Sequence, residues 1–350
     1  MRHSVVAFVA ALSIGGVVMG DNAALTGAKR AKKDEFYTQR VDIENELRHY
    51  KAHFAGKVVL CNCDDPRQSE FFKYFVENFE KLGLKRLVAT CYKSQDVDLF
   101  SQKDCERAIC QIYEGDKNGN MILDDDEVGV RELRGDGDFR SEECIELLKK
   151  ADIVVTNPPF SLFREYIAQL VKYGKKFLII GNQNAITYKE IFLLLKSNEM
   201  WIGYKFGDMA FKVPADSEPR ATRYWQDESG QKWRSLGNVC WFTNLDVQKR
   251  HEKLPLYKKY TPEEFPRYDN YDAIEVSKTA DIPQDYDGVM GVPITFMDKY
   301  NPEQFEILGC SDNGAVGEEY KLPHFKRHNE PYIDGKKVYK RIFIRRRKAQ

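Results

Sequence analysis

Several features that would assign a protein to a class are missing from these 350 residues. The 54 basic and 54 acidic residues leave no net charge, so the composition does not demand a nucleic-acid partner. No internal repeat or low-complexity block is present, which excludes a repeat architecture. The eight cysteines form no Cys-x-x-Cys pair and no His/Cys spacing of a zinc site, so we expect no bound metal. The chain is still long enough for one large domain or two.

Long apolar runs are also scarce. The stretch from Val5 to Val18 resembles a secretory signal and is too short for a membrane span. We instead expect residues 1–27 to be a disordered leader or an over-extended start, with translation from Met19. Cysteines such as Cys61 and Cys91 lie in apolar, strand-like runs and predict reduced, buried thiols. These features predict a cytoplasmic protein with no membrane partner.

Short apolar runs alternate with amphipathic segments through the first 200 residues. Strands are expected at Lys57 to Cys61, Lys85 to Cys91, Ala151 to Thr156 and Lys176 to Gly181. Helices are expected at about Val41 to Phe54, Ser69 to Leu82, Ser141 to Lys150, Ser161 to Val171 and Tyr188 to Ser197. This alternation predicts an α/β fold with a doubly wound, Rossmann-like parallel sheet.

An acidic segment from Asp116 to Glu127 partly imitates a calcium-binding loop. Its sixth position is Met121, where the sharp turn of such a loop needs glycine. Ile109 to Tyr113 has the pattern of a strand, and Asn118-Gly119 is a turn signal between paired strands. We therefore predict a β-hairpin here.

The composition changes after residue 200 and divides the chain into regions. Residues 28–200 are expected to form the core. Residues 201–310 are β-like and rich in Tyr, Trp, Lys and Arg, with Val239 to Thr243 as a strand that returns to the main sheet. Residues 311–350 form a basic tail.

The most informative segment is Asn157-Pro158-Pro159-Phe160, which follows an apolar strand and precedes a helix. The two prolines fix φ and remove backbone donors, and the residue before a proline is held extended. The turn therefore projects the Asn157 amide and the Phe160 ring beyond the carboxyl end of the strand, where ligands bind in open α/β sheets. Two carbonyl oxygens and an aromatic face, held rigidly, suit a planar base with an exocyclic amino group.

Acidic and aromatic side chains are expected at the same edge of the sheet. They are Asp64, Asp65 and Pro66 after the first strand, and Asp136, Asp138 and Phe139 before the helix that leads to the motif strand. The carboxylates can accept hydrogen bonds from ribose hydroxyls or pair with an ammonium, and the Phe139 ring can cover an adenine. Their joint placement predicts a pocket for S-adenosylmethionine.

The order of these segments resembles that of DNA adenine-N6 methyltransferases, and specifically the EcoRI modification methylase family. The matching segments are Asp34 to Gln39, Asp64 to Arg67, Gly135 to Ser141, Asp152 to Ser161, Cys240 to Asp246, Tyr268 to Ile274 and Gly288 to Phe296. The resemblance covers roughly residues 28–310. It departs from the usual pattern at Arg67-Gln68-Ser69, where the first cofactor loop of most methyltransferases carries glycines.

The resemblance implies roles for individual residues. The residues implied to contact the cofactor S-adenosylmethionine are Phe36, Tyr37, Thr38, Asp65, Pro66, Asp138 and Phe139. Those implied to take part in catalysis are Asn157, Pro158, Pro159 and Phe160. It implies methylation of adenine N6 in duplex DNA by base flipping, at a GAATTC-like site. It also implies a restriction-modification system with a cognate endonuclease.

The region after residue 200 is expected to recognise the target sequence. Arginine with guanine, and asparagine or glutamine with adenine, are common contacts in the major groove. The candidates for DNA contacts are Arg220, Arg223, Gln226, Arg234 and Asn238. Two alternatives stay open: methylation of an RNA base or a protein glutamine, because such enzymes share the Asn-Pro-Pro-aromatic turn, and an inactive DNA-binding homologue.

Overall fold

In the computed structural model of the protein, the structure describes residues 37–63, 65–92, 108–116, 119, 127–213, 217, 219, 221–311 and 329–347. Phe36, Asp64 and Arg220 lie outside the described residues. So do the leader, most of the acidic segment after Asp116 and much of the tail. Within the described ranges, no helix is long and apolar enough to cross a membrane.

The chain divides into two compact units. The first ends at Asn182 and resumes with Lys205–Leu245, and the second comprises Gln183–Tyr204 and the chain from Asp246 onward. The predicted regions 28–200, 201–310 and 311–350 were defined by expected function, whereas these units are defined by contacts in space. The predicted functional division therefore stays a prediction.

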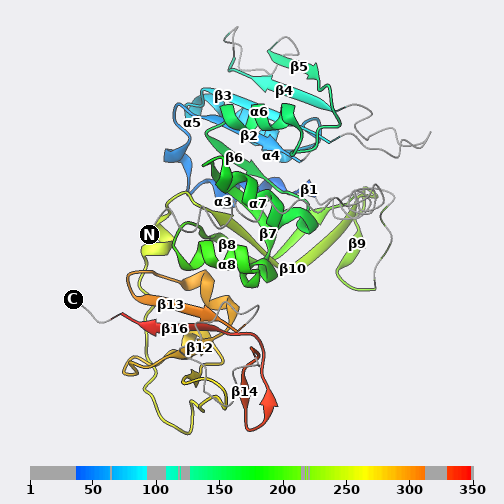
Figure 1. The fold of residues 1–350 in the computed structure, drawn as a ribbon. Coiled ribbons are helices and arrows are strands. Elements are labelled where there is room, and N and C mark those ends of the chain that lie inside the picture. The colour runs from blue at the N-terminus through cyan, green and yellow to red at the C-terminus, as the bar shows by residue number, and fades with distance from the viewer. Residues whose placement is uncertain are drawn as a thin grey trace. The chain divides into compact units, whose positions relative to one another are not determined.

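The first unit contains a large mixed sheet, in which the strands follow the order β1-β8-β10-β7-β6-β2-β3-β4-β5, with β9 paired to β10 (Figure 1). Its strands are β1 (Tyr37–Thr38), β2 (Val58–Asn62), β3 (Arg86–Thr90), β4 (Ile109–Tyr113), β5 (Val128–Glu132), β6 (Ile153–Thr156), β7 (Lys176–Asn182), β8 (Trp201–Lys212), β9 (Tyr224–Gln226) and β10 (Lys232–Thr243). Its helices are α3 (Arg40–Leu47), η1 (Lys51–His53), α4 (Glu70–Glu77), α5 (Phe79–Leu82), α6 (Glu142–Lys150), η2 (Phe160–Leu162) and α7 (Phe163–Lys172).

The centre of this sheet is parallel and buried. Strand β2 pairs in parallel with β3 and β6, and β6 pairs in parallel with β7. Their side chains are almost completely shielded from solvent, including Leu60, Val154, Val155, Ile179 and Ile180. Continuous apolar runs are typical of parallel strands covered on both faces, which is why the sequence pattern located these four strands.

Helices cover both faces of the parallel centre. The connection from β2 through α4 leads to β3, towards the β5 edge of the sheet. The connection from β6 through α7 leads to β7, towards the β1 edge. Right-handed crossovers in opposite directions place α4 and α7 on opposite faces, as in a doubly wound fold. The α4 helix buries Phe71, Phe72 and Phe75, and Gly83 takes a left-handed conformation with φ of 62° after α5.

The outer strands of the sheet are antiparallel, which corrects the prediction of a parallel sheet. Strands β3, β4 and β5 form antiparallel pairs, and so do β7 and β10. Antiparallel neighbours need no crossover helix between them. The alternation of apolar runs with helices in the sequence therefore does not reveal such pairs. Two local predictions are confirmed: β4 and β5 form a hairpin around the acidic segment, and Val239 to Thr243 pairs with β7.

The prediction of free thiols is wrong at one position. Cys61, Cys63, Cys110, Cys144, Cys240 and Cys310 keep thiols that form no disulfide, and five of these six are buried. Cys91, directly after β3, is disulfide-bonded.

The second unit contains a four-stranded sheet in the order β11-β12-β16-β13 and a separate hairpin of β14 and β15. Its elements are η3 (Gln183–Thr187), α8 (Lys189–Lys196), η4 (Gln248–His251), β11 (Ile274–Glu275), η5 (Thr279–Asp281), β12 (Met290–Val292), η6 (Ile294–Lys299), β13 (Phe305–Cys310), β14 (Tyr332–Ile333), β15 (Lys336–Lys337) and β16 (Ile342–Arg346). Helix α8 contacts β13, and β16 is paired on both sides.

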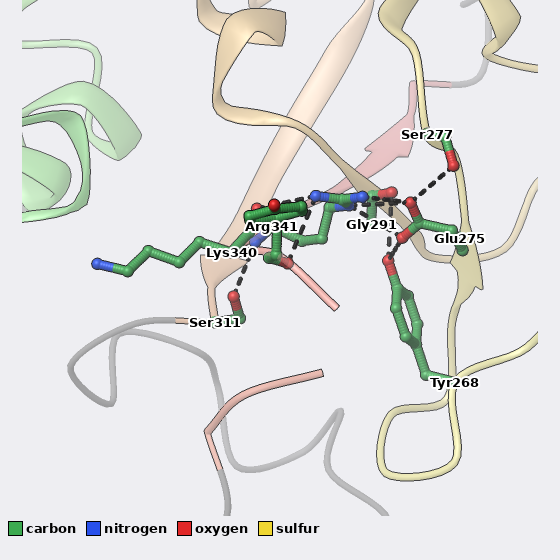
Figure 2. Close-up of polar contacts among 8 residues, drawn as sticks. Tyr268, Glu275, Ser277, Gly291, Ser311, Lys340 and Arg341 are labelled. Carbon is green, nitrogen blue, oxygen red and sulfur yellow. Dashed lines mark hydrogen bonds and ion pairs between the residues drawn. The ribbon is translucent and has the colours of Figure 1, made fainter. Parts of the chain in front are cut away.

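A buried polar cluster ties the C-terminal strand to this unit (Figure 2). The Arg341 guanidinium, directly before β16, pairs with both carboxylate oxygens of Glu275 in β11, with Nε at 3.0 and 2.9 Å. The Tyr268 hydroxyl donates to the same carboxylate. Glu275 is 6% exposed and Arg341 8% exposed. A buried charge pair is tolerated when its hydrogen bonds are satisfied, so the cluster fixes the position of the last strand.

Candidate active site

The candidate site lies where the direction of the sheet connections changes. Strands β2 and β6 are neighbours, and the chain leaves them in opposite directions along the sheet. The carboxyl ends of such a strand pair flank the crevice that binds ligands in doubly wound folds. The first acidic loop follows β2, and Asn157 follows β6. The structure therefore brings two of the predicted segments to the adjacent carboxyl ends of β2 and β6.

The Asn157-to-Phe160 turn is stiff and only partly covered. Asn157 and Pro158 are buried, and Pro159 and Phe160 are half-buried. Pro159 is extended, with φ of −54° and ψ of 125°, and its carbonyl accepts from the Leu162 amide at 3.0 Å. The amide of Asn157 is thereby held in a low-dielectric environment, while the Phe160 ring keeps an accessible part.

Two hydrogen bonds lock the ends of β2 and β6 together. The Thr156 hydroxyl, next to Asn157, donates to the backbone carbonyl of Asn62. The Tyr166 hydroxyl, on α7, donates to the side-chain Oδ1 of Asn62. Tyr166 is fully buried, and burial raises its pKa well above the ordinary value, so the hydroxyl stays protonated and remains a donor. The position of Asn157 therefore depends on Asn62 and Tyr166.

The Gly135-to-Phe139 loop lies against the end of β3. Gly137 has φ of +80°, and a Cβ at this position would lie 2.1 Å from the carbonyl oxygen of Cys91. Glycine is required there because only it combines this φ with such a close approach of two backbones. The amide of Asp138 donates to the Asp136 carboxylate at 3.0 Å, which closes the turn.

Phe139 connects this loop to the motif helix. Its ring packs edge to face on Tyr166, with centroids 5.1 Å apart and planes at 71°. Gln169 of α7 donates to its carbonyl at 3.0 Å. Phe139, Tyr166, Asn62 and Thr156 therefore form one continuous chain of contacts that ends beside Asn157.

Two of the four predicted cofactor carboxylates, Asp65 and Asp138, are each paired with an arginine two residues further on. Asp65 accepts from the Arg67 amide at 3.0 Å and from its Nη2 at 2.8 Å. Asp138 accepts from the Arg140 amide and Nε at 2.8 Å, and from Nη2 at 2.6 Å. Burial raises the pKa of Asp138, but the hydrogen bonds and charge of Arg140 outweigh this and hold the pKa below its ordinary value. Its carboxylate is therefore charged at neutral pH.

Cys63 takes the conformation that the absent glycines would favour. It directly follows β2 and has φ of 82°, where a side chain on Cβ is strained. The loop then turns on Asp65, whose carbonyl accepts from the amides of Gln68 and Ser69 at 2.9 and 2.7 Å. The loop thus closes without glycine, at the expense of strain at Cys63.

Replacing Cys63 with glycine is expected to preserve the fold and to raise stability by up to about 1 kcal/mol, because it relieves the left-handed strain. Cys63→Val is the matched contrast, because a β-branched side chain is least suited to positive φ. Thermal unfolding of both variants tests this account. A glycine variant that is less stable than the valine variant would contradict it.

Tyr37 and Thr38 lie at the end of the sheet formed by the carboxyl ends of the parallel strands, where the Asn157-to-Phe160 turn also lies. They form β1, which pairs with Lys212 and Phe211 at the end of β8. The amide of Val213 donates to the Lys232 carbonyl, so this end of β8 lies beside the start of β10 and beyond the carboxyl end of β7. Thr38 is 3% exposed, and its Oγ1 has no hydrogen-bond partner among the described residues. A buried hydroxyl of this kind suits a polar ligand group.

Four of the five candidate DNA-contacting residues, all except Arg220, lie on or next to the β9–β10 hairpin. Arg223 pairs with Asp208 at 3.0 Å, and Gln226 donates to the Gly230 carbonyl at 2.8 Å. Asn238 donates to the Asn182 side chain at 3.1 Å, and Arg234 lies opposite Tyr224. Gln226 thus braces the turn of the hairpin, and Asn238 ties β10 to β7.

Reasoning from the sequence missed Asn62 and Tyr166. An asparagine at the end of a strand and a tyrosine on an amphipathic helix carry no distinctive pattern. Their importance arises from a contact across 104 positions of the chain.

Tyr166→Phe is expected to lower the free energy of unfolding by about 1–3 kcal/mol, since it leaves the buried Asn62 oxygen without its donor. The turnover rate should fall as well, because Asn157 loses its support. Tyr173→Phe, at the end of the same helix, is the control. Urea denaturation and turnover measured in parallel test both parts. An unchanged rate and stability would show that the hydroxyl has no role.

The doubly wound fold, with the Asn157-to-Phe160 turn at the carboxyl end of a central strand, is that of the α/β class of methyltransferases. Residues 24–347 match the family described as "Adenine-specific methyltransferase EcoRI". The chain belongs to this family and is an adenine-specific DNA methyltransferase, which confirms the predicted family, fold class and enzyme class.

Named relatives support this assignment. The chain is 50% identical over 333 residues to the Type II methyltransferase M.EcoRI of Escherichia coli, covering 94% of this chain and 98% of that protein. It is 37% identical over 329 residues to the Type II methyltransferase M.MgeORF184P of Mycoplasma genitalium, covering 91% and 97%. It is 37% identical over 330 residues to the Type II methyltransferase M.MpnI of Mycoplasma pneumoniae, also covering 91% and 97%. No solved structure shows a significant match.

Proposed function

We propose that the protein transfers the methyl group of S-adenosylmethionine to adenine N6 in duplex DNA, after turning the target base out of the helix. The observation that carries this proposal is the Asn157-to-Phe160 turn at the adjacent carboxyl ends of β2 and β6, with a buried Asn157 and a half-buried Phe160. An amino group within a stacked duplex cannot reach such a recessed turn, so extrusion of the base is required.

The turn supplies alignment and electrostatics. The Asn157 side-chain oxygen and the Pro158 carbonyl each accept a hydrogen bond from one N–H of the adenine amino group, and Phe160 stacks on the base. Loss of conjugation with the ring makes the nitrogen lone pair available to bond the methyl group that the bound cofactor would supply. The methyl–sulfur bond would break as the methyl–nitrogen bond forms, and the methylated amino group would then lose one proton to solvent. Positive charge that develops on the nitrogen is stabilised by the two oxygens in a site of low dielectric. No protein nucleophile is needed, because the reactive methyl belongs to the cofactor.

The residues around the crevice fit S-adenosylmethionine, which supplies an activated methyl group when bound. Thr38 offers a buried hydroxyl, and Phe139 offers an apolar ring beside the loop of Asp136 and Asp138. Asp65 with Pro66 lines the β2 side of the crevice. The arginine partners use most of the acceptor sites on Asp65 and Asp138. A ribose hydroxyl therefore has to share a carboxylate oxygen with an arginine. Phe36 and Tyr37 remain candidates on the resemblance alone, and Asp64 remains one because of its place after the first predicted strand.

The region from residue 201 to 310 is proposed to recognise the target, with Arg223 and Arg234 contacting DNA and Arg220 as a further candidate. The basic residues 311–350 can add contacts with phosphates. A cytoplasmic location and a partner endonuclease for the same site follow from a role in restriction and modification.

A protection assay tests the target site. Plasmid DNA from cells that express the protein is expected to resist cleavage by an endonuclease specific for GAATTC and to remain sensitive to endonucleases with unrelated sites. Full cleavage at GAATTC, together with N6-methyladenine elsewhere in the plasmid, would replace the proposed site. The absence of methylated adenine would favour the open alternatives, namely RNA, protein glutamine or an inactive homologue.

A further inference from the structure

Two tryptophans of the first unit lie on the β9–β10 hairpin and stack on each other. Trp225 and Trp233 are direct cross-strand partners, with ring planes 9° apart and centroids 6.3 Å apart. Trp225 is 42% exposed, whereas the core residue Trp241 is completely buried. A large exposed indole contributes little to the core, and exposed aromatic surface of this kind often marks a binding site.

The inner tryptophan is held rigidly. Its Nε1 donates to Asp227 Oδ2 at 2.7 Å, and Lys212 Nζ lies 5.8 Å from the ring centroid. Asp227 also accepts from the amides of Ser229 and Gln231 at 2.9 and 3.0 Å, which fixes the hairpin turn. Trp233 therefore presents Trp225 in a defined orientation, so little conformational entropy is lost when Trp225 stacks on a ligand.

The hairpin extends beyond the edge of the sheet that carries Asn157. In the antiparallel pairing of β10 with β7, Val239 lies opposite Asn182, the last residue of β7. Residues of β10 before Val239 therefore continue past the carboxyl ends of the parallel strands. Trp233 is six positions before Val239, which corresponds to roughly 20 Å of extended strand. The stacked tryptophans thus lie well beyond the carboxyl ends of the parallel strands, the edge of the sheet that carries Asn157.

We propose that the exposed face of Trp225 stacks on the base of the partner strand that loses its pair when the target adenine is turned out. This inference rests on the proposed function. In a closed duplex each base is held in the stack partly by its pairing, and extrusion of the adenine leaves its former partner unpaired, so that this base can unstack and offer a face. An indole face can stack on any base, so the contact stabilises the opened duplex without reading its sequence. The reach of the hairpin past the crevice fits contact with the more distant strand.

A binding cycle tests the inference. The probes are two duplexes that contain GAATTC, one intact and one with an abasic unit in place of the thymine opposite the target adenine, each with S-adenosylhomocysteine present. Trp225→Ala is expected to weaken binding of the intact duplex about tenfold, as a stacking contact of 1–3 kcal/mol predicts. It should change binding of the abasic duplex by less than about twofold, because the stacking partner is already absent. Trp225→Phe should bind both duplexes nearly as the wild type does.

The other outcomes overturn the inference. An equal loss on both duplexes would show a general effect on the hairpin or on contacts with phosphates, and no loss on either would show that Trp225 does not contact DNA. Val130→Ala, a substitution of an exposed apolar residue on β5 at the opposite edge of the sheet, is the control and should match the wild type. Methylation by the wild-type protein is measured in the same preparation. A wild type that does not methylate DNA contradicts the proposed function, whereas an active wild type with an unaffected Trp225→Ala variant contradicts this inference alone.

Discussion

Replacing Asn157 with alanine is expected to reduce the rate of methyl transfer by about 100- to 1,000-fold, the range found when one preorganised hydrogen-bonding group of a catalytic site is removed. Asn157 is buried at the end of β6, so no other side chain can easily take over its acceptor oxygen. Single-turnover transfer with saturating DNA and S-adenosylmethionine isolates the chemical step. Binding of DNA and of the cofactor should change little, because other residues supply most of those contacts.

Asn157→Asp provides the matched comparison. Aspartate keeps an acceptor oxygen at nearly the same position, so it should retain more activity than alanine. Equal activities of the wild-type, alanine and aspartate proteins would remove Asn157 from the mechanism. Equal and complete losses, together with a lower melting temperature, would indicate that the residue is needed for folding rather than for chemistry.

Gly137→Ala is expected to weaken binding of S-adenosylmethionine by about 100-fold. A side chain at φ of +80° costs roughly 1–2 kcal/mol, and relieving the 2.1 Å approach to the Cys91 carbonyl costs roughly another 1–3 kcal/mol. If the loop moves away from β3 together with Asp138 and Phe139, binding of the cofactor weakens. If the loop stays in place, the strain instead lowers the stability of the folded protein. Isothermal titration with the cofactor and thermal unfolding together distinguish these two results.

Gly135→Ala is the control for this substitution. Gly135 lies two positions earlier in the same loop, has no positive φ, and a Cβ there would meet no atom within 4 Å. This variant should bind the cofactor as the wild type does. Similar losses for both variants would show that the loop is sensitive to any substitution and would contradict the specific role of Gly137.

Local sequence patterns predicted the parts of the site that are built from neighbouring residues. The apolar runs located β2, β3, β6 and β7, because buried parallel strands have little tolerance for polar residues. The two prolines of the motif determine the geometry of the turn by themselves. Once these strands were placed in a doubly wound sheet, the motif and the acidic loops had to share its carboxyl edge.

Contacts between distant segments could not be predicted in this way. The interaction of Tyr166 with Asn62 depends on how α7 packs on the sheet. The return of Val239 to Thr243 to the sheet was predicted, but its partner strand β7 and its antiparallel direction were not. The pairing of Asp138 with Arg140 is local, but the charge pattern alone does not show whether the carboxylate faces an arginine or a ligand. Conformational strain at Cys63 is likewise invisible in the sequence, since cysteine rarely takes positive φ.

The most direct test of the account is the identity of the methylated product. The purified protein is incubated with S-adenosylmethionine labelled in the methyl group and with unmethylated plasmid DNA, and the DNA is then digested to nucleosides and separated. The account predicts that the label is recovered in N6-methyladenine, and that Asn157→Ala loses this label. Label in another nucleoside, in the protein itself, or in no product at all would contradict it.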